Sequence, residues 1–354
     1  MKRVLVINPG ATSTKFAVFE DEKQLFKKSA EHSAQEINKY NRVVDQYQYR
    51  LDLILKTLEE EGIELNTLAG VVGRGGLLKP LAGGTYEVNK NMIEDLEKAE
   101  RGEHASNLGA VMANNLAVKL GITSYIVDPV SVDEMEPVAR ISGLPDLERV
   151  SLSHALNMKA VARKVAKEMD RKYEETNFIV AHLGTGVSVT PHKNGKMIDV
   201  NNAKEEGPFS ADRCGGLPAN LLTKLCYSGK YTYQEMKEKL SSRGGIYAYL
   251  GTTDLREAEK MAVEGNQEAN YVLAALAYQV AKEIGAMAAV LEGQVDRIIL
   301  TGGMANSQRI VSDITRRVKF IAPVVLVPGE EELEALALGA LRVLNGEEKA
   351  KEYI

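Results

Sequence analysis

The chain has 354 residues, of which 44% are hydrophobic and 26% are charged, so it is long enough to bury a sizeable core and to form more than one domain. Its formal net charge of -5 gives no sign of a nucleic-acid partner. It has two cysteines, Cys214 and Cys226, no run of 18 apolar residues, and no leader-like segment before the first apolar run. We therefore expect a reduced, cytoplasmic protein without a membrane span.

The first half of the chain alternates between predicted strands and helices. The pattern predicts strands at 4–7, 15–19, 24–29, 68–72 and 124–127, and helices at 39–61, 90–97, 107–120 and 152–170. The longest of these helices carries its apolar residues on one side: Leu51, Ile54, Leu55 and Leu58. Strands alternating with helices indicate an α/β fold.

At Phe178 the opening pattern restarts. The segment "FIVAHLGTGVSVTPHKNGKM" has the same order as "VLVINPGATSTKFAVFEDEKQL": an apolar strand, a polar residue (His182 or Asn8), a glycine-containing turn, a second strand and a reversal. This order predicts an internal duplication; two unrelated hairpins of similar pattern are the alternative.

The remainder of the second half continues the alternation. Helices are predicted at 267–292, from 307 and at 331–344, and strands at 297–300 and 324–327. We expect two domains, 1–148 and 149–335, with a C-terminal helical segment, about 336–354, packing back on the first.

Three turns of small residues follow predicted strands: "NPGATSTK", "HLGTGVS" and "LTGGMANS". Such turns expose backbone N–H groups that suit phosphate, and Lys15 adds a positive charge. An ordinary polar hairpin or a strand-to-helix turn is the alternative for each. The sequence lacks GxxxxGK[ST], a complete GxGxxG after a strand, and the HRD and DFG pair of protein kinases.

In this order the turns resemble the motifs of the acetate/butyrate kinase family, which belongs to the actin-like superfamily of sugar kinases, Hsp70 and actin. The resemblance extends from "VLVINPGATSTKF" through "DRCGG" to "PGEEELEALALGA"; "GRGG" and "SLSHALN" are similar to the branch that acts on butyrate or branched-chain fatty acids. It implies two duplicated ribonuclease-H-like domains with a cleft and a nucleotide between them, of which 149–335 is the C-terminal, nucleotide-binding domain. It also implies ATP-dependent phosphorylation of a carboxylate and a homo-oligomer.

The resemblance also implies catalytic residues. A carboxylate acceptor is already ionised at neutral pH, so its site needs cations and hydrogen-bond donors rather than a general base. The residues that match the family's catalytic positions are Arg74, facing the acid, Arg213, His154 and His182 at the phosphoryl group, and Asp128 near the metal or an arginine. A surface arginine, a salt bridge to Asp212 and structural histidines are the alternatives. Nothing supports a site role for His32, His104 or His192.

The nucleotide and its Mg²⁺ have implied ligands as well. The residues expected to bind ATP or ADP are Thr12, Thr14, Lys15, Gly184, Gly186, Asp254, Arg256, Gly302, Gly303 and Asn306. Asn8 and Glu331 are expected to hold Mg²⁺ through water, although the register among Glu330, Glu331 and Glu332 is open. Acidic residues at a helix start also favour the helix dipole without any ligand.

The residues after Arg74 bear on which acid is used. We expect Arg74, Gly75 and Gly76 to line the acid pocket. The two glycines would deepen an apolar slot, in which each further buried methylene contributes about 0.8 kcal/mol. This favours butyrate or a branched acid over acetate or propionate. The alternatives are a sugar kinase with Asp128 as its general base, and an actin-like nucleotide switch.

Overall fold

The computed structural model describes residues 1–354 and divides into two compact units. Unit 1 comprises Met1–Val132 and Glu331–Ile354, and unit 2 comprises Asp133–Glu330. The predicted domain boundaries, after 148 and after 335, lie later in the chain than these divisions, and the assignment of domains to functions stays a prediction.

Unit 1 is built on a six-stranded mixed sheet with the order β3-β2-β1-β4-β6-β5. The first three strands form an antiparallel meander, β4 and β6 continue the sheet in parallel with β1, and β5 pairs antiparallel with β6. The strands are β1 (Arg3–Pro9), β2 (Ser13–Glu20), β3 (Lys23–Glu31), β4 (Leu68–Arg74), β5 (Thr85–Glu87) and β6 (Thr123–Val127).

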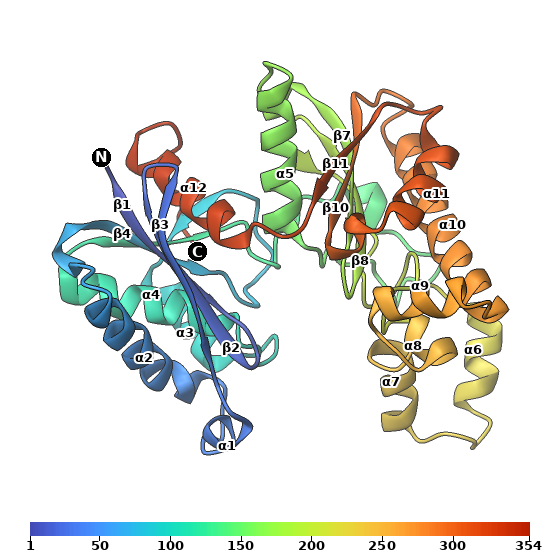
Figure 1. Cartoon of the computed structure of the whole chain (residues 1–354), viewed down its shortest axis with the longest axis horizontal. Coiled ribbons are helices and arrows are strands. Elements are labelled where there is room, and N and C mark those ends of the chain that lie inside the picture. Colours follow the sequence, from blue (N-terminus) through green and yellow to red (C-terminus); the bar gives the residue numbers. More distant parts are fainter. The chain divides into compact units, whose positions relative to one another are not determined.

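Helices cover both faces of this sheet (Figure 1). Alternate strand residues such as Leu5 and Ile7 pack with residues of α2 and α4 in one core cluster, while α12 packs on β1, β4 and β6. Because neighbouring strand residues point to opposite faces, a strand buried on both sides is apolar throughout, as 4–7 is. The helices are α1 (Ala34–Ile37), α2 (Tyr47–Glu60), α3 (Lys90–Lys98), α4 (Asn107–Leu120) and α12 (Glu332–Leu344).

Unit 2 repeats the same plan. Its sheet has the order β9-β8-β7-β10-β11, with an antiparallel meander followed by two parallel strands. This is the order and direction of β3-β2-β1-β4-β6, so the predicted duplication is confirmed at the level of topology. The strands are β7 (Asn177–Leu183), β8 (Val187–Lys193), β9 (Lys196–Met197), β10 (Arg297–Gly302) and β11 (Val324–Pro328).

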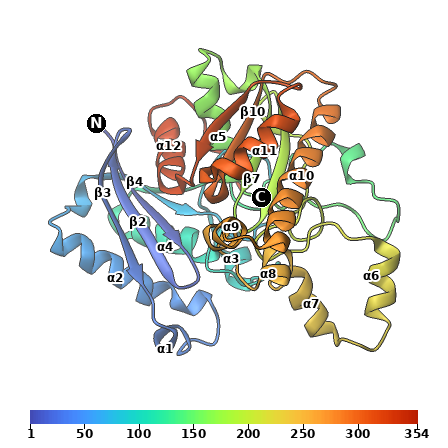
Figure 2. The same ribbon diagram turned by 45° about the vertical axis from the view of Figure 1, so that its right-hand side comes forward.

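The helices of unit 2 also lie on two faces. Ile179, Ala181 and Leu300 face the cluster that α10 and α11 contribute to, whereas Phe178 and Ile299 face α5. Figure 2 shows α10 and α11 running alongside β7 and β10. The helices are α5 (Ala155–Glu168), α6 (Ala219–Cys226), α7 (Tyr233–Ser241), α8 (Gly245–Leu250), α9 (Leu255–Val263), α10 (Gln267–Val290) and α11 (Gln308–Val318).

Helix α10 is long and apolar enough to cross a membrane by length and composition alone. Its apolar stripe, which includes Leu276, Val280 and Ile284, is buried in the core cluster of unit 2. The stripe is therefore accounted for by packing within the protein.

Two parts of the predicted secondary structure are wrong. The helix predicted to begin at 39 begins at Tyr47, because Arg42 and Val43 are instead held by Glu103, and the Arg42 N–H donates to Asp45. Helix α1, helices α6 to α9 and strand β5 were not predicted. Helix α6 buries no residue, so it lacks the core-facing periodicity on which such predictions depend.

Candidate active site

The turn between β1 and β2 closes the first hairpin of unit 1. The Gly10 N–H donates to the Ser13 carbonyl at 2.7 Å. Thr12 and Lys15 are exposed, as phosphate ligands would be. Thr14 is fully buried, and its hydroxyl lies 2.8 Å from His32 Nε2 and accepts a hydrogen bond from Arg50. The structure therefore places Thr14 beneath the turn, so a phosphate contact through its hydroxyl does not fit.

Three side chains meet beside this hairpin. Arg74 ends β4, the parallel neighbour of β1, and its Nη1 donates to Glu332 Oε2 at 3.0 Å and Asn8 Oδ1 at 3.3 Å. Asn8 Nδ2 donates to the same Glu332 oxygen at 2.7 Å, and Arg74 Nη2 lies 2.9 Å from Oε1. Of the three adjacent glutamates it is Glu332 that joins Asn8. The predicted residue, Glu331, occupies the N-cap position of α12.

Asp128 follows β6, the next strand along. It is 1% exposed and adopts a left-handed backbone conformation with φ of 37°. Its Oδ1 accepts from the Gly84 N–H at 2.6 Å, and its own N–H donates to the Gly84 carbonyl at 3.0 Å. A non-glycine residue in this region is strained. Asp128 thus fixes the loop that ends at Gly84, next to the strand that carries Arg74.

Gly75 and Gly76 do not open a slot. A Cβ added to Gly76 would lie 2.4 Å from Asn107 Oδ1, and one added to Gly75 would lie 2.4 Å from Pro129 Cβ. These glycines allow the chain after β4 to pack against the start of α4 and the chain after β6. The expectation that missing side chains deepen an apolar pocket is wrong, because protein atoms fill that space.

In unit 2 two histidine rings stack at the end of the central strand. The rings of His154 and His182 lie 3.8 Å apart at an interplanar angle of 10°. His154 Nδ1 is 3.0 Å from Ser188 Oγ. His182 is 1% exposed, and neither ring nitrogen makes a hydrogen bond, although Nε2 lies 3.1 Å from Glu330 Oε1 in a poorly aligned contact. Buried polar atoms without hydrogen bonds are rare and often functional.

Arg213 lies against the glycine turn of unit 2. A Cβ on Gly186 would be 2.4 Å from Arg213 Nη1, and one on Gly184 would be 2.8 Å from His182 Nε2. The fold thus brings Arg213, His182 and both turn glycines to one place. The neighbouring Asp212 is 3.9 Å from Arg213 Nε, and burial raises the pKa of the Asp212 carboxyl although Arg213 lowers it.

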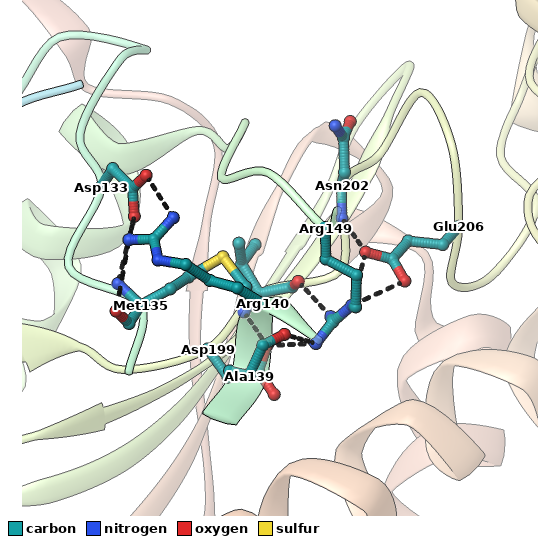
Figure 3. Close-up of polar contacts among 9 residues, drawn as sticks. Asp133, Met135, Ala139, Arg140, Arg149, Asp199, Asn202 and Glu206 are labelled. Atoms are coloured by element: carbon teal, nitrogen blue, oxygen red, sulfur yellow. Dashed lines mark hydrogen bonds and ion pairs between the residues drawn. The ribbon is translucent and has the colours of Figure 1, made fainter. Parts of the chain in front are cut away.

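A partly buried ion-pair network supports the loop that leads to Arg213. The Arg149 guanidinium contacts Glu206 through Nε at 3.1 Å, Asp199 at 3.0 Å and the Val200 carbonyl at 2.8 Å. Figure 3 shows this cluster beside the paired Arg140 and Asp133. Further along the same loop, the Ala203 carbonyl accepts from Arg213 Nη1 at 3.4 Å.

The remaining nucleotide candidates lie in two places in unit 2: Gly302, Gly303 and Asn306 at the end of β10, and Asp254 and Arg256 at the start of α9. Gly302 crowds the Leu183 backbone, while a Cβ on Gly303 would meet nothing within 4 Å. Asn306 donates to the Gly303 carbonyl. Asp254 caps α9 and binds Arg256 through both carboxylate oxygens, which lowers the pKa of Asp254 to about 2. Within the protein this pair is explained by helix capping.

Sequence reasoning missed Arg50 and left the choice among Glu330, Glu331 and Glu332 open. Glu332 contacts Asn8 across more than three hundred residues, and Glu330 faces His182. Arg50, which contacts the first turn, lies on the apolar side of α2 four residues before Ile54. A charged residue on a predicted buried face was the available signal for Arg50.

Two sheets with the same strand order, each with a small-residue turn after its central strand, form the architecture of the actin-like ATPase fold. The fold is similar to that of acetate kinase from Porphyromonas gingivalis (TM-score 0.81, 21% identity, 97% of this chain and 100% of that one). It is also similar to a propionate kinase from Francisella tularensis (TM-score 0.74, 17% identity, 96% and 99% covered). The predicted duplicated α/β fold is confirmed.

The family model of the acetokinase family matches residues 151–328. The chain is 53% identical over its full length to the full length of Butyrate kinase 1 of Clostridium acetobutylicum, and 52% identical to Butyrate kinase 2 of that organism over 99% of each chain. The chain belongs to the acetokinase family, and the resemblance read from its motifs is confirmed.

Proposed function

We propose that this protein transfers the terminal phosphoryl group of ATP to the carboxylate of a short-chain fatty acid, butyrate or a branched acid, and that the reaction is reversible. The observation that carries the proposal is the 53% identity to Butyrate kinase 1, which spans both chains completely. The site chemistry supports it, since arginines and glycine turns suit two anionic reactants and direct in-line transfer.

The roles of the residues follow from their surroundings. In unit 2, Arg213 and His182 adjoin the Gly184 and Gly186 turn and would bind the transferring phosphoryl group. His154, stacked on His182, would fix that ring. In unit 1, Arg74 would bind the acid carboxylate. Because Glu332 already holds both Nη atoms of Arg74, an incoming acid would compete with Glu332 for the guanidinium.

The nucleotide contacts are proposed from exposure and open backbone. In unit 1, Thr12 and Lys15 would reach the phosphates, and we leave Thr14 out. In unit 2, Gly303 and Asn306 would line the ribose side, with Gly302 shaping the turn. We keep Asp254 and Arg256 as adenosine-side candidates that are already explained by their own ion pair.

Few protein side chains would bind Mg²⁺. No group of three or more His, Cys, Asp or Glu side chains could hold a metal ion. Asn8 and Glu332 are hydrogen-bonded to each other through Asn8 Nδ2, and Asn8 Oδ1 accepts from Arg74. Their oxygens would therefore reach a cation through water, which fits one that keeps several waters and is brought by the nucleotide. Glu332 replaces Glu331 in this proposal, and bound Mg²⁺ would supply charge neutralisation at the phosphates.

The argument that Gly75 and Gly76 select a longer acid no longer holds. Since Gly75 and Gly76 face filled space, they say nothing about chain length. The preference for butyrate or a branched acid rests on the full-length relatives. A cytoplasmic location and a homo-oligomeric state belong to the proposal as well, on the evidence of the family alone.

The direct test is an acyl-hydroxamate assay of the purified chain with ATP, Mg²⁺ and linear and branched acids of two to six carbons. We expect trapped acyl phosphate with the highest kcat/KM for a four-carbon or branched acid. Highest kcat/KM on acetate would overturn the acid assignment. Slow ATP hydrolysis with no hydroxamate from any acid would favour a nucleotide switch, and phosphorylation of a hexose would favour a sugar kinase.

A further inference from the structure

Arg50 is a fully buried arginine that no carboxylate neutralises. It lies in α2, is 1% exposed, and makes no ion pair. An isolated buried charge is costly unless hydrogen bonds compensate it. Burial lowers the pKa of the guanidinium, yet an arginine stays protonated in proteins. A full positive charge therefore lies inside unit 1, and its position needs a reason.

The hydrogen bonds of Arg50 all lead to the turn between β1 and β2 or to one orienting residue. Nη1 donates to the Gly10 carbonyl at 2.8 Å and to Thr14 Oγ1 at 3.2 Å, and Nη2 donates to the Ala11 carbonyl at 3.2 Å. Gln46 Oε1 accepts from Nε at 3.2 Å and from Nη2 at 2.7 Å. The planar fork is thus fixed against the inner side of the turn.

The carbonyl groups of the turn are bonded to protein donors, whereas two of its N–H groups have no protein acceptor. The carbonyls of Gly10 and Ala11 point inward to Arg50, and the Thr12 carbonyl accepts from the His32 N–H. The N–H groups of Ala11 and Thr12 donate to no protein acceptor, and both residues are exposed. Successive free N–H groups form the kind of concavity that binds anions.

We propose that Arg50 is a positioning residue for nucleotide phosphate: it holds the Gly10–Thr12 turn with the Ala11 and Thr12 N–H groups outward and supplies, from beneath, the uncompensated charge that an anionic phosphate neutralises. The ligand is the phosphate chain of a nucleotide rather than its nucleoside. This inference rests on the proposed function, because it takes the turn to be a phosphate site. His32 and Thr14 complete the layer beneath the turn without contributing charge of their own, since burial lowers the pKa of His32 to about 4.

The test compares ATP with adenosine, because only ATP carries the charge that Arg50 is proposed to serve. The Kd of each ligand is measured by titration calorimetry for the wild-type chain and for Arg50→Gln. We expect Arg50→Gln to raise the Kd of ATP about ten- to a hundredfold, the range for lost charged hydrogen bonds, and to leave the Kd of adenosine unchanged. Equal weakening of both ligands, or no weakening in a folded variant, would overturn the proposal.

Two further variants separate charge from fold. Arg3→Gln removes the same charge from the far end of β1, where Arg3 pairs with Glu20, and it should leave both affinities unchanged; weakening of ATP by this variant would also overturn the proposal. Arg50→Lys keeps the positive charge but loses the planar guanidinium, so it should raise the Kd of ATP only a few-fold and leave the Kd of adenosine unchanged. If Arg50→Gln does not fold, the lysine variant decides by the same criterion.

Wild-type activity keeps the two hypotheses apart. If the wild-type chain forms acyl phosphate but the Arg50 variants lose affinity for ATP and for adenosine equally, the positioning role fails and the proposed function stands. If the wild-type chain binds neither ligand, the proposed function fails, and the inference fails with it.

Discussion

The two units carry the same hairpin with arginine on different sides of its turn. In unit 1 the guanidinium of Arg50 lies beneath the turn, 1% exposed and bonded to backbone carbonyls. In unit 2 the guanidinium of Arg213 lies against Gly186, and its side chain is 24% exposed. A buried arginine bonded to carbonyls can shape a turn, whereas a partly exposed arginine beside glycines can contact a ligand.

The glycines differ between the units in the same sense. Gly75 and Gly76 in unit 1 are needed because backbone and rigid side chains pack against them, while Gly184 and Gly186 in unit 2 leave room for His182 and Arg213. The first pair serves the fold and the second pair serves functional side chains. Four changes test this contrast, from the largest expected effect to the smallest.

The largest effect should come from Arg213→Ala. We expect kcat for acyl phosphate formation to fall by about three orders of magnitude, by analogy with other arginines that stabilise phosphoryl transfer. Steady-state kinetics with saturating acid and ATP measures it. Arg213→Lys should recover only part of the rate, since a lysine lacks the bidentate fork. A loss below tenfold in the alanine variant would remove Arg213 from the transition state.

Gly76→Val should damage the fold of unit 1 rather than change the acid preference. The new Cβ would lie 2.4 Å from Asn107 Oδ1 and 2.6 Å from Asn107 Cα, and overpacking of this kind costs about 3 kcal/mol of unfolding free energy or more. Urea unfolding measures the cost, and kcat/KM should fall equally for acetate and butyrate.

The matched control is Gly143→Val, because a Cβ at Gly143 meets nothing within 4 Å. It should change the unfolding free energy by no more than about 0.5 kcal/mol. A Gly76 variant that stays stable and gains activity on acetate would restore the slot hypothesis.

Gly186→Ala should reduce activity while leaving the fold intact. The added methyl group would displace Arg213 Nη1, the end of a flexible side chain. A displacement of about 1 Å at a reacting site can reduce the rate by about a hundredfold. Kinetics and thermal unfolding are measured together. Gly285→Ala, a helical position with nothing within 4 Å of the new Cβ, should keep full activity; a large loss of stability in Gly186→Ala would make that glycine structural.

The smallest effect concerns the layer beneath the first turn and its dependence on pH. Burial, and secondarily Arg50, lowers the pKa of His32 from 6.5 to about 4. Between pH 6.5 and 4 the His32 side chain is therefore protonated in the unfolded chain but neutral in the folded chain. His32 thus contributes stability above pH 6.5 that is lost as the pH falls towards 4. At pH 5 the loss should be about 2 kcal/mol of unfolding free energy relative to pH 8.

Urea unfolding between pH 4.5 and 8 measures this slope in the wild-type chain and in His32→Gln, which keeps a polar atom near Thr14. We expect a shallower slope in the variant. Buried His192, whose pKa is also lowered by burial, contributes in the same direction and stays unchanged in both proteins. Identical slopes would contradict the buried, neutral His32.

Local sequence signals predicted much of the secondary structure because their causes are local. Helix α4 was predicted at its observed bounds, 107–120, and ends at Gly121 in the left-handed conformation that glycine permits. Asn194 and Gly195 both have positive φ, as a two-residue hairpin of this type requires. The predicted start of α2 was wrong because contacts with Glu103, which is distant in sequence, hold the preceding residues out of the helix.

The sequence by itself determined the α/β alternation, the duplicated hairpins, the three small-residue turns and the family, because periodicity, turn residues and motifs depend on neighbours along the chain. Only the tertiary structure decided that Glu332 rather than Glu331 joins Asn8 and Arg74. It also decided that Thr14 is buried with Arg50 beneath a turn, and that Gly76 faces Asn107 instead of a pocket. These outcomes depend on which distant side chains share a space, and a one-residue change of register at a helix start turns a side chain by about 100°.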